Sequence, residues 1–170
     1  MDTERQSELD GLFEELFNAY RSPILNYIYR LVDDSSCAEE LCQEVFLRAY
    51  KALGRLSADA NHRAWLYRIA TNAAYDKLRR RKLIKWLPLM DNDGSTAPVV
   101  GPERLTVEHQ AMEQALRQVP SKYRGPLLLY TVQGYSLREI GEIMGISEGA
   151  VKTRLFRARE KLRVAYGGDR

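Results

Sequence analysis

Apolar residues recur at helical spacing along most of the chain, with no pattern typical of strands. The first apolar stripe covers residues 9–32 and contains Pro23, where we expect the helix to bend or restart. Polar residues 33–36 supply a turn and an N-cap for a second amphipathic helix over residues 38–53. A third long helix follows over residues 63–85. Together these stretches predict one helical bundle.

Residues 86–104 break this helical pattern. The stretch contains three prolines and two glycines and has no amphipathic period. We therefore predict a flexible linker that joins a domain over residues 1–85 to a second helical domain over residues 105–170. In the second domain, an amphipathic stretch leads to a turn at Pro120, and a short apolar helix follows over residues 126–132. The predicted fold class is all-α, with two helical domains.

The pattern of a helix-turn-helix occupies residues 135–163. Ser136 begins a capping box with the glutamate three residues further on, and Gly145 permits the sharp turn that ends the first helix. Ser147 then caps a second helix, and Gly141 supplies the small residue needed where the two helices touch. The apolar stripes of the two helices consist of Leu137, Ile140 and Met144, and of Val151, Leu155 and Leu162.

The second helix of this pair has a surplus of positive charge, which suits DNA phosphates and guanine edges. Its basic residues are Lys152, Arg154, Arg157, Arg159, Lys161 and Arg163, against the acidic Glu148 and Glu160. Short helix pairs with a glycine corner also occur in helical proteins that never contact DNA. The glycine corner, the apolar register and the basic second helix together favour DNA binding over that alternative.

The charge distribution is more informative than the formal net charge of +3 over 170 residues. Residues 1–50 hold eleven acidic residues against four basic ones, whereas basic residues concentrate in residues 63–85 and in the last helix. An acidic surface favours a protein partner, and basic surfaces favour nucleic acid. We therefore expect at least two kinds of partner.

Several functional classes lack their sequence signals. No stretch approaches the ~20 apolar residues of a membrane span, and the first ten residues do not resemble a signal peptide, so we expect a cytoplasmic protein without membrane insertion. Cys37 and Cys42 point about 140° apart around a helix, which favours reduced packing residues over a redox role. His62 and His109 have no companions at ligand spacing, so we expect no metal and no cofactor. No catalytic grouping indicates an enzyme.

The predicted helix over residues 63–85 interleaves aromatic and basic residues. Rings and guanidinium planes stack on unpaired bases while cations follow the phosphates, so this pattern suits single-stranded DNA. The alternative is that Trp65 and Tyr67 fill the bundle core, and we favour that alternative for Trp65. Asn72, just over one turn beyond Arg68, carries an amide able to read the edge of an extruded base.

Three motifs follow one another along nearly the whole chain. They are EELCQEVFLRAYKAL, AWLYRIATNAAYDKLRRR and YSLREIGEIMGISEGAVKTRLFRAREKL. Together they resemble bacterial RNA polymerase sigma factors of the extracytoplasmic function (ECF) group. The resemblance implies a two-domain, non-enzymatic initiation factor that recruits core RNA polymerase to promoters. The first domain resembles sigma region 2, which binds the β′ clamp and opens the −10 element. The second resembles region 4, which sits on the β flap and reads the −35 element.

The resemblance assigns roles to three sets of residues in this chain. The clamp-binding set consists of Glu40, Gln43, Glu44 and Phe46. The set for the −10 element consists of Trp65, Arg68, Asn72, Lys77, Arg79 and Arg80. The set for the −35 element consists of Ser147, Lys152, Thr153, Arg154, Phe156 and Arg157. Within these sets, Asn72 holds the position that captures a flipped base, and Ser147 and Arg154 suit phosphates.

Three positions qualify this assignment. His62 stands where the family usually has a phenylalanine, which leaves the −10 sequence open, and Ala150 replaces a common threonine at the start of the recognition helix. Phe156 points away from the apolar stripe, where it either touches a thymine methyl or packs against the preceding helix.

The resemblance also implies an anti-sigma partner that clamps the two domains together. The alternative function is a conventional helix-turn-helix regulator whose first domain senses a ligand or a signalling partner. The aromatic and basic helix of the first domain discriminates between the two, because such a regulator would not need it.

Overall fold

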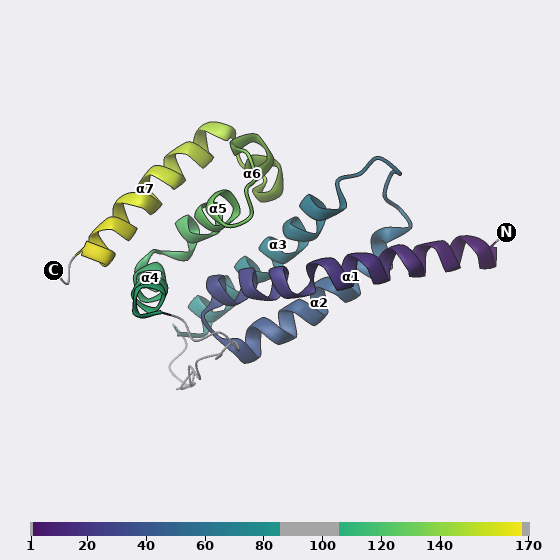
Figure 1. Ribbon diagram of the computed structural model, residues 1–170, viewed down its shortest axis with the longest axis horizontal. Helices are drawn as coiled ribbons and strands as arrows, with labels where there is room; N and C mark the ends of the chain where they lie inside the picture. Colours follow the sequence, from purple (N-terminus) through teal and green to yellow (C-terminus); the bar gives the residue numbers. More distant parts are fainter. Residues whose placement is uncertain (1, 86–105, 168–170) are drawn as a thin grey trace. The chain divides into compact units, whose positions relative to one another are not determined.

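The computed structural model describes residues 2–85 and 106–167, and every regular element in these ranges is an α-helix. The helices are α1 (Asp2–Val32), α2 (Ser35–Leu53), α3 (His62–Lys85), α4 (Val107–Gln118), α5 (Ser121–Thr131), α6 (Leu137–Met144) and α7 (Glu148–Gly167) (Figure 1). The predicted all-α fold class is confirmed. The helices form two compact units, α1 to α3 and α4 to α7. The predicted linker lies outside the described residues.

In the first unit, α1, α2 and α3 pack against one another around a common core. A buried polar contact fixes α3 against α1. The Thr71 hydroxyl donates to the Tyr67 carbonyl oxygen at 2.6 Å, so the Tyr27 hydroxyl is the donor in its own 2.8 Å contact with Thr71 Oγ1. The rings of Tyr27 and Tyr67 also meet edge to face, with centroids 5.3 Å apart. The rotation of α3 about its axis is therefore specified.

Pro23 lies inside α1, which runs without interruption from Asp2 to Val32. Of the bend or restart predicted near Ser22, the restart is therefore excluded. Proline removes one backbone hydrogen bond, but Ile24, Tyr27 and Ile28, directly after it, are at most 2% exposed. Packing of this turn against the other helices outweighs the lost bond and keeps the helix continuous.

The turn between α1 and α2 consists of two aspartates. Asp33 adopts a left-handed backbone conformation with φ of 53°, which aspartate tolerates better than most residues. Asp34 is the N-cap of α2, and its Oδ1 accepts a hydrogen bond from the Cys37 amide at 2.9 Å. The predicted polar cap is confirmed.

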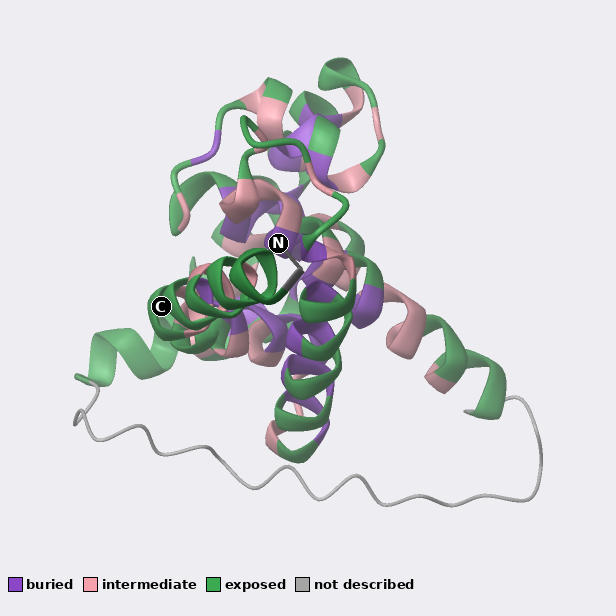
Figure 2. Ribbon diagram, turned by 90° about the vertical axis from the view of Figure 1, so that its right-hand side faces the viewer, coloured by how far each residue is buried: buried purple, intermediate pink, exposed green. Residues whose placement is uncertain are grey.

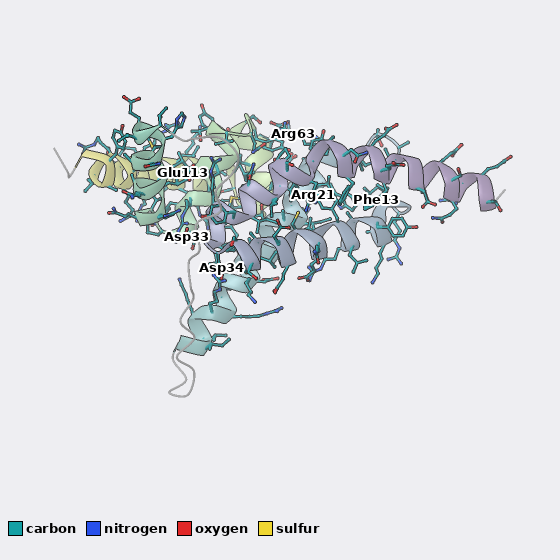
Figure 3. All side chains as sticks on the ribbon, turned by 60° about the horizontal axis from the view of Figure 1, so that its bottom comes forward. Phe13, Arg21, Asp33, Asp34, Arg63 and Glu113 are labelled. Carbon is teal, nitrogen blue, oxygen red and sulfur yellow. The ribbon has the colours of Figure 1, made fainter. Side chains whose placement is uncertain are left out.

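Aromatic side chains join the amino-terminal half of α1 to α2. The ring of Phe13 meets the ring of Tyr50 at a centroid distance of 5.1 Å, and the ring of Phe17 meets that of Phe46 at 5.0 Å. The Tyr50 hydroxyl donates to Asp10 Oδ1 at 3.0 Å. Figure 3 shows Phe13 and Arg21 on the side of α1 that faces α2. This part of α1 is therefore held by α2.

In the second unit, α7 packs against α4, α5 and α6. In both units the buried residues lie on the helix faces that meet one another (Figure 2). The prediction that α5 starts at Pro126 is wrong, because the helix begins at Ser121 and includes the proline. Every residue from Arg124 to Leu129 is buried, so packing again outweighs the backbone hydrogen bond that proline lacks.

Candidate nucleic-acid interface

The corner between α6 and α7 has the local geometry that its sequence predicts. The Ser136 amide donates to Glu139 Oε2 at 2.7 Å, and the Glu139 amide donates to Ser136 Oγ at 3.2 Å, which completes the capping box. Gly145 ends α6 with φ of 67°, a conformation that favours glycine. The Ser147 hydroxyl accepts the Ala150 amide at 3.1 Å and so caps α7.

Gly141 sits where the corner passes closest to α6. A Cβ at this position would stand 2.8 Å from the carbonyl oxygen of Ile146, so any side chain would displace the corner. The apolar stripe of α6 differs slightly from its prediction, because Ile143 is 2% exposed whereas Met144 is only half-buried. These contacts fix the direction in which α7 leaves the turn.

One face of α7 is buried in the unit and the opposite face is open to solvent. The buried residues are Val151, Leu155 and Ala158. The exposed residues of the predicted −35 set are Ser147, Lys152, Thr153, Phe156 and Arg157. Phe156 is 68% exposed, so it points outward and does not pack against α6. Arg154 is half-buried at the edge of this face, and Thr153 donates its hydroxyl to the Gly149 carbonyl oxygen at 3.1 Å.

Tyr123, on α5, adds to this surface and was not part of the sequence prediction. A hydrogen bond from Arg157 is the main cause that lowers the pKa of Tyr123, and the positive charges of Arg157 and Lys122 act in the same direction. Tyr123 thus lies beside the guanidinium of Arg157, although the two residues are 34 positions apart in the sequence. No local sequence pattern predicts such a contact, since it depends on how α5 packs against α7.

The exposed face of α3 carries most of the predicted −10 set. Arg68 and Asn72 are exposed and lie one helical turn apart, which places them on the same face. Arg79 and Arg80 are also exposed further along the helix, and Arg79 forms an ion pair with Asp76. Lys77 is half-buried.

The core position that the sequence analysis favoured for Trp65 is held by Tyr67. Tyr67 is completely buried, whereas Trp65 is half-buried and keeps part of its ring accessible. The reason is the phase of the helix: the buried positions of α3 are Leu66, Tyr67, Ala70, Thr71, Ala73 and Ala74. Trp65 lies at the border of this stripe, beside the exposed face that carries Arg68 and Asn72.

The acidic face of α2 is exposed at Glu40, Gln43 and Glu44. Phe46 does not belong to this surface, which corrects its assignment to the clamp-binding set. Its side chain is 3% exposed and its ring lies against that of Phe17, because residue 46 falls on the buried stripe of the helix. Leu47 is 55% exposed and continues the acidic face one turn beyond Gln43 and Glu44.

Leu47 was missed by the sequence analysis, although a signal existed. It is out of phase with the buried stripe Leu41, Cys42, Val45, Phe46 and Ala49. An apolar residue outside the buried phase of an amphipathic helix indicates an exposed contact residue. The acidic face and Leu47 together form a surface with both charge and apolar area.

The two cysteine thiols are buried and not bonded to each other. Burial raises the pKa of both thiols, that of Cys42 to about 11, and the Cys42 thiol donates to the Arg21 carbonyl oxygen at 3.8 Å. Among residues 2–85 and 106–167, no group of three or more acidic, cysteine or histidine residues is placed to hold a metal ion. No helix within the same ranges is long and apolar enough to cross a bilayer.

Comparison with known families places a domain on each of the two units. The family described as Sigma-70 region 2 matches residues 16–84, and the family described as Sigma-70, region 4 matches residues 109–162. An all-α chain with these two regions in this order belongs to the class of sigma-70-type transcription initiation factors.

Similarity to two curated relatives indicates which group of sigma factors the chain resembles. The chain is 35% identical to the ECF RNA polymerase sigma factor SigW of Bacillus subtilis, over 89% of this chain and 87% of the relative. It is 32% identical to the RNA polymerase sigma-H factor of Pseudomonas aeruginosa, over 88% and 83% of the two chains. The sigma factor RpoE of Bartonella quintana, solved in complex with the anti-sigma factor NepR, shares the fold with a TM-score of 0.76 at 23% identity, over 93% and 98% of the two chains.

The protein therefore belongs to the ECF family of RNA polymerase sigma factors. It is an alternative transcription initiation factor that directs core RNA polymerase to promoters, and the regulator alternative is not favoured. Its relatives are sigma factors, which are not enzymes.

Proposed function

We propose that the two domains divide the promoter between them, with residues 1–85 acting at the −10 element and residues 105–170 at the −35 element, joined by the linker 86–104. The observation that carries this proposal is that α3 and α7 each bury one face and expose a basic one. Basic helix faces bind phosphates, and side chains between the cations can read bases.

On α7, the exposed residues suit the major groove of a duplex. Arg157 can donate two hydrogen bonds to a guanine, and Phe156 can contact a thymine methyl group. Lys152 and Thr153 lie on the same exposed face, where they can reach neighbouring base edges. Ser147 at the start of the helix and Arg154 at the edge of the face suit phosphates, because a helix amino terminus and a guanidinium both attract anions.

On α3, the exposed residues suit an unpaired strand. The Asn72 amide can donate to and accept from the edge of a flipped base, and the accessible part of the Trp65 ring can stack beside it. Arg68, Lys77, Arg79 and Arg80 can neutralise phosphates along the strand. Flipping a base costs a few kcal/mol, so strand opening is driven here by binding the flipped base and not by catalysis.

The acidic face of α2 suits the β′ clamp of core RNA polymerase. Glu40, Gln43 and Glu44 can complement a basic protein surface, and Leu47 adds an apolar contact within it. The same carboxylates would repel DNA, which separates the polymerase contact from the base contacts on α3. We assign the β flap to the second domain.

We also propose an anti-sigma partner, which would hide both DNA-binding faces. Two solved sigma factors of similar fold, from Bartonella quintana and the factor CnrH, are complexes with an anti-sigma protein or its domain. The protein would act in the cytoplasm, as a binding protein without catalytic activity, cofactor or metal.

The test is transcription from a template pool with a randomised promoter region, using core RNA polymerase with and without the protein. We expect initiation only with the protein present, and selected templates that share two elements at a fixed spacing. Binding to DNA without any polymerase-dependent initiation would instead support the regulator alternative. The selected elements then serve as probes for the residue-level roles.

A further inference from the structure

Four consecutive basic residues, 79–82, end the exposed face of α3, and the structure separates one of them from the others. Arg79, Arg80 and Lys82 are exposed, whereas the side chain of Arg81 is only 31% exposed. In sequence all four are equivalent candidates for phosphate contacts. In the fold, Arg81 points back into its own domain.

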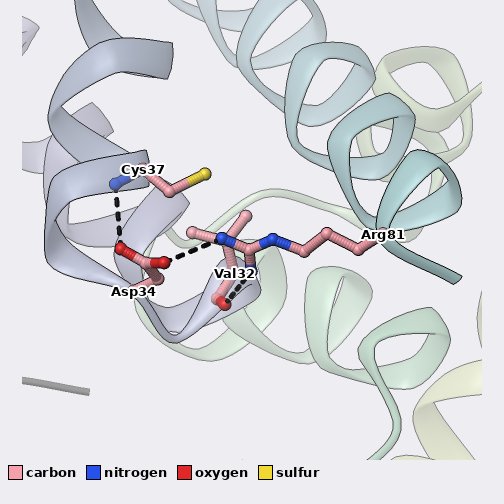
Figure 4. A network of polar contacts seen from close by, with 4 residues as sticks. All are labelled: Val32, Asp34, Cys37 and Arg81. Carbon is pink, nitrogen blue, oxygen red and sulfur yellow. Dashed lines mark hydrogen bonds and ion pairs between the residues drawn. The ribbon is translucent and has the colours of Figure 1, made fainter. Parts of the chain in front are cut away.

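Arg81 uses both ends of its guanidinium fork within the domain (Figure 4). Its Nη1 donates to the Val32 carbonyl oxygen at 3.0 Å, and its Nη2 donates to Asp34 Oδ2 at 2.9 Å. The second oxygen of the same carboxylate, Asp34 Oδ1, accepts the Cys37 amide that caps α2. Val32 is the last residue of α1, so a single side chain of α3 holds the end of α1 and the start of α2.

This attachment lies where α3 has little other support. Its last fully packed residue is Ala74, and none of the residues 75–84 is buried. Tyr75 and Leu78 are half-buried, and beyond them the two hydrogen bonds of Arg81 hold this end of the helix to α1 and α2. Arg79 and Arg80 lie on this same stretch.

We propose that Arg81 is a positioning residue and not a DNA contact. Paired with Asp34, it fixes the end of α3, with Arg79 and Arg80, relative to α2. A polymerase-bound α2 then carries the DNA-binding end of α3 as one rigid body. This inference rests on the proposed roles of α2 and α3.

Two variants separate positioning from phosphate binding. Arg81→Lys keeps the positive charge but loses the planar fork that reaches both acceptors, so a phosphate contact would survive it and a positioning contact would not. Asp34→Asn removes the charge of the partner but keeps a side chain that caps a helix as well as aspartate does. If one of these variants fails to fold, the other carries the test alone.

The measurement is the affinity of the holoenzyme, formed with core RNA polymerase, for a fork-junction DNA carrying the −10 element selected from the template pool. It is made over a range of salt concentrations, at a temperature where melting curves show each variant folded. We expect Arg81→Lys and Asp34→Asn each to weaken binding about three- to tenfold, with the salt dependence of the wild type. The double variant should be no weaker than either single one, because both break the same contact.

The matched control is Arg80, the exposed neighbour of Arg81. Arg80→Lys should bind nearly as the wild type does, and Arg80→Gln should weaken binding and reduce the slope of log affinity against log salt by about 0.7 to 0.9. Arg81→Gln, the counterpart of Arg80→Gln, should leave the salt slope at its wild-type value. A reduced salt slope in Arg81→Gln, or wild-type affinity of both Arg81→Lys and Asp34→Asn, would overturn the positioning role. Wild-type behaviour of Arg80→Gln and Asn72→Ala would instead overturn the proposed function of α3 itself.

Discussion

Gly141 and Ile146 are in such close approach that a Cβ on residue 141 would stand 2.8 Å from the Ile146 carbonyl oxygen. Backbone atoms cannot move aside as a flexible side chain can, so the contact requires glycine. The corner of the helix-turn-helix therefore depends on the absence of a side chain at residue 141. The direction of α7 depends on the same residue.

We expect Gly141→Ala to lower the free energy of unfolding of the second domain by about 1 to 3 kcal/mol. Hydrogen exchange of the α6 and α7 amides in the full chain measures this. The matched control is Gly149→Ala on α7, where the nearest atom to an added Cβ is the Ser147 hydroxyl at 4.0 Å. That variant should be neutral or more stable by up to about 1 kcal/mol, since alanine favours a helix. Equal effects of the two substitutions would contradict the steric argument.

Alanine substitutions of Arg157 and Arg154 should weaken DNA binding in different ways. Arg157→Ala should weaken binding to the selected −35 element by about 1 to 3 kcal/mol and relax the base preference there. Arg154→Ala should weaken all sequences about equally, because a phosphate contact carries no sequence information. Holoenzyme binding to cognate and scrambled −35 duplexes measures both. The same loss on both duplexes for Arg157→Ala would refute base reading by Arg157.

Asn72→Ala should impair strand opening and spare recognition of the upstream duplex. The amide is exposed on α3, so its removal leaves the core of the domain unchanged. Permanganate reactivity of thymines in the −10 element reports open complexes, and binding to a −35 duplex is the control. Wild-type permanganate reactivity would exclude the base-capturing role.

Phe46 and Leu47 are neighbours with opposite expected effects. Phe46→Ala should destabilise the first domain by about 3 to 5 kcal/mol, since the ring is 3% exposed and packs on Phe17. Leu47→Ala should leave stability within about 0.5 kcal/mol and weaken binding to core RNA polymerase by about 1 kcal/mol or more. Urea unfolding and competition against a labelled sigma factor measure the two quantities. Wild-type competition by Leu47→Ala would remove residue 47 from the polymerase contact.

Cys42 should react slowly with thiol reagents in the folded protein. Burial raises its pKa to about 11, so only about one thiol in a thousand is ionised at pH 8. The folded pKa lies above the unfolded value, so this thiol favours folding below the unfolded pKa, near 9, and that contribution is lost as the pH rises toward 11. Labelling rates with a maleimide in the folded and the urea-unfolded chain check this, with Cys42→Ser identifying the site. Equal rates in both states would contradict the burial.

Much of the fold and of the candidate site could be predicted from sequence because the signals are local. The capping box of Ser136 and Glu139, the left-handed Gly145 and the cap at Ser147 all involve residues within a few positions of one another. The outward direction of Phe156 follows from its phase on α7. Such features do not depend on how the helices pack against one another.

The boundary between core and surface was harder to predict. Trp65 and Phe46 each lie within one position of the edge of a buried stripe, and a shift of one residue turns a helical side chain by about 100°. The prolines inside α1 and α5 do not interrupt their helices as the sequence analysis expected. Burial of the neighbouring residues, which depends on packing, outweighs the missing backbone hydrogen bond.

The sequence alone determined the helices, the helix-turn-helix and the separation of acidic from basic surfaces, because periodicity, capping and charge are properties of short segments. Only the tertiary structure decided that Arg81 is paired whereas Arg80 is exposed, because the partner of Arg81 is 47 positions away. It likewise decided that Tyr123 lies beside Arg157, 34 positions further along the chain. Contacts between distant segments depend on the packing of whole helices, which no local pattern encodes.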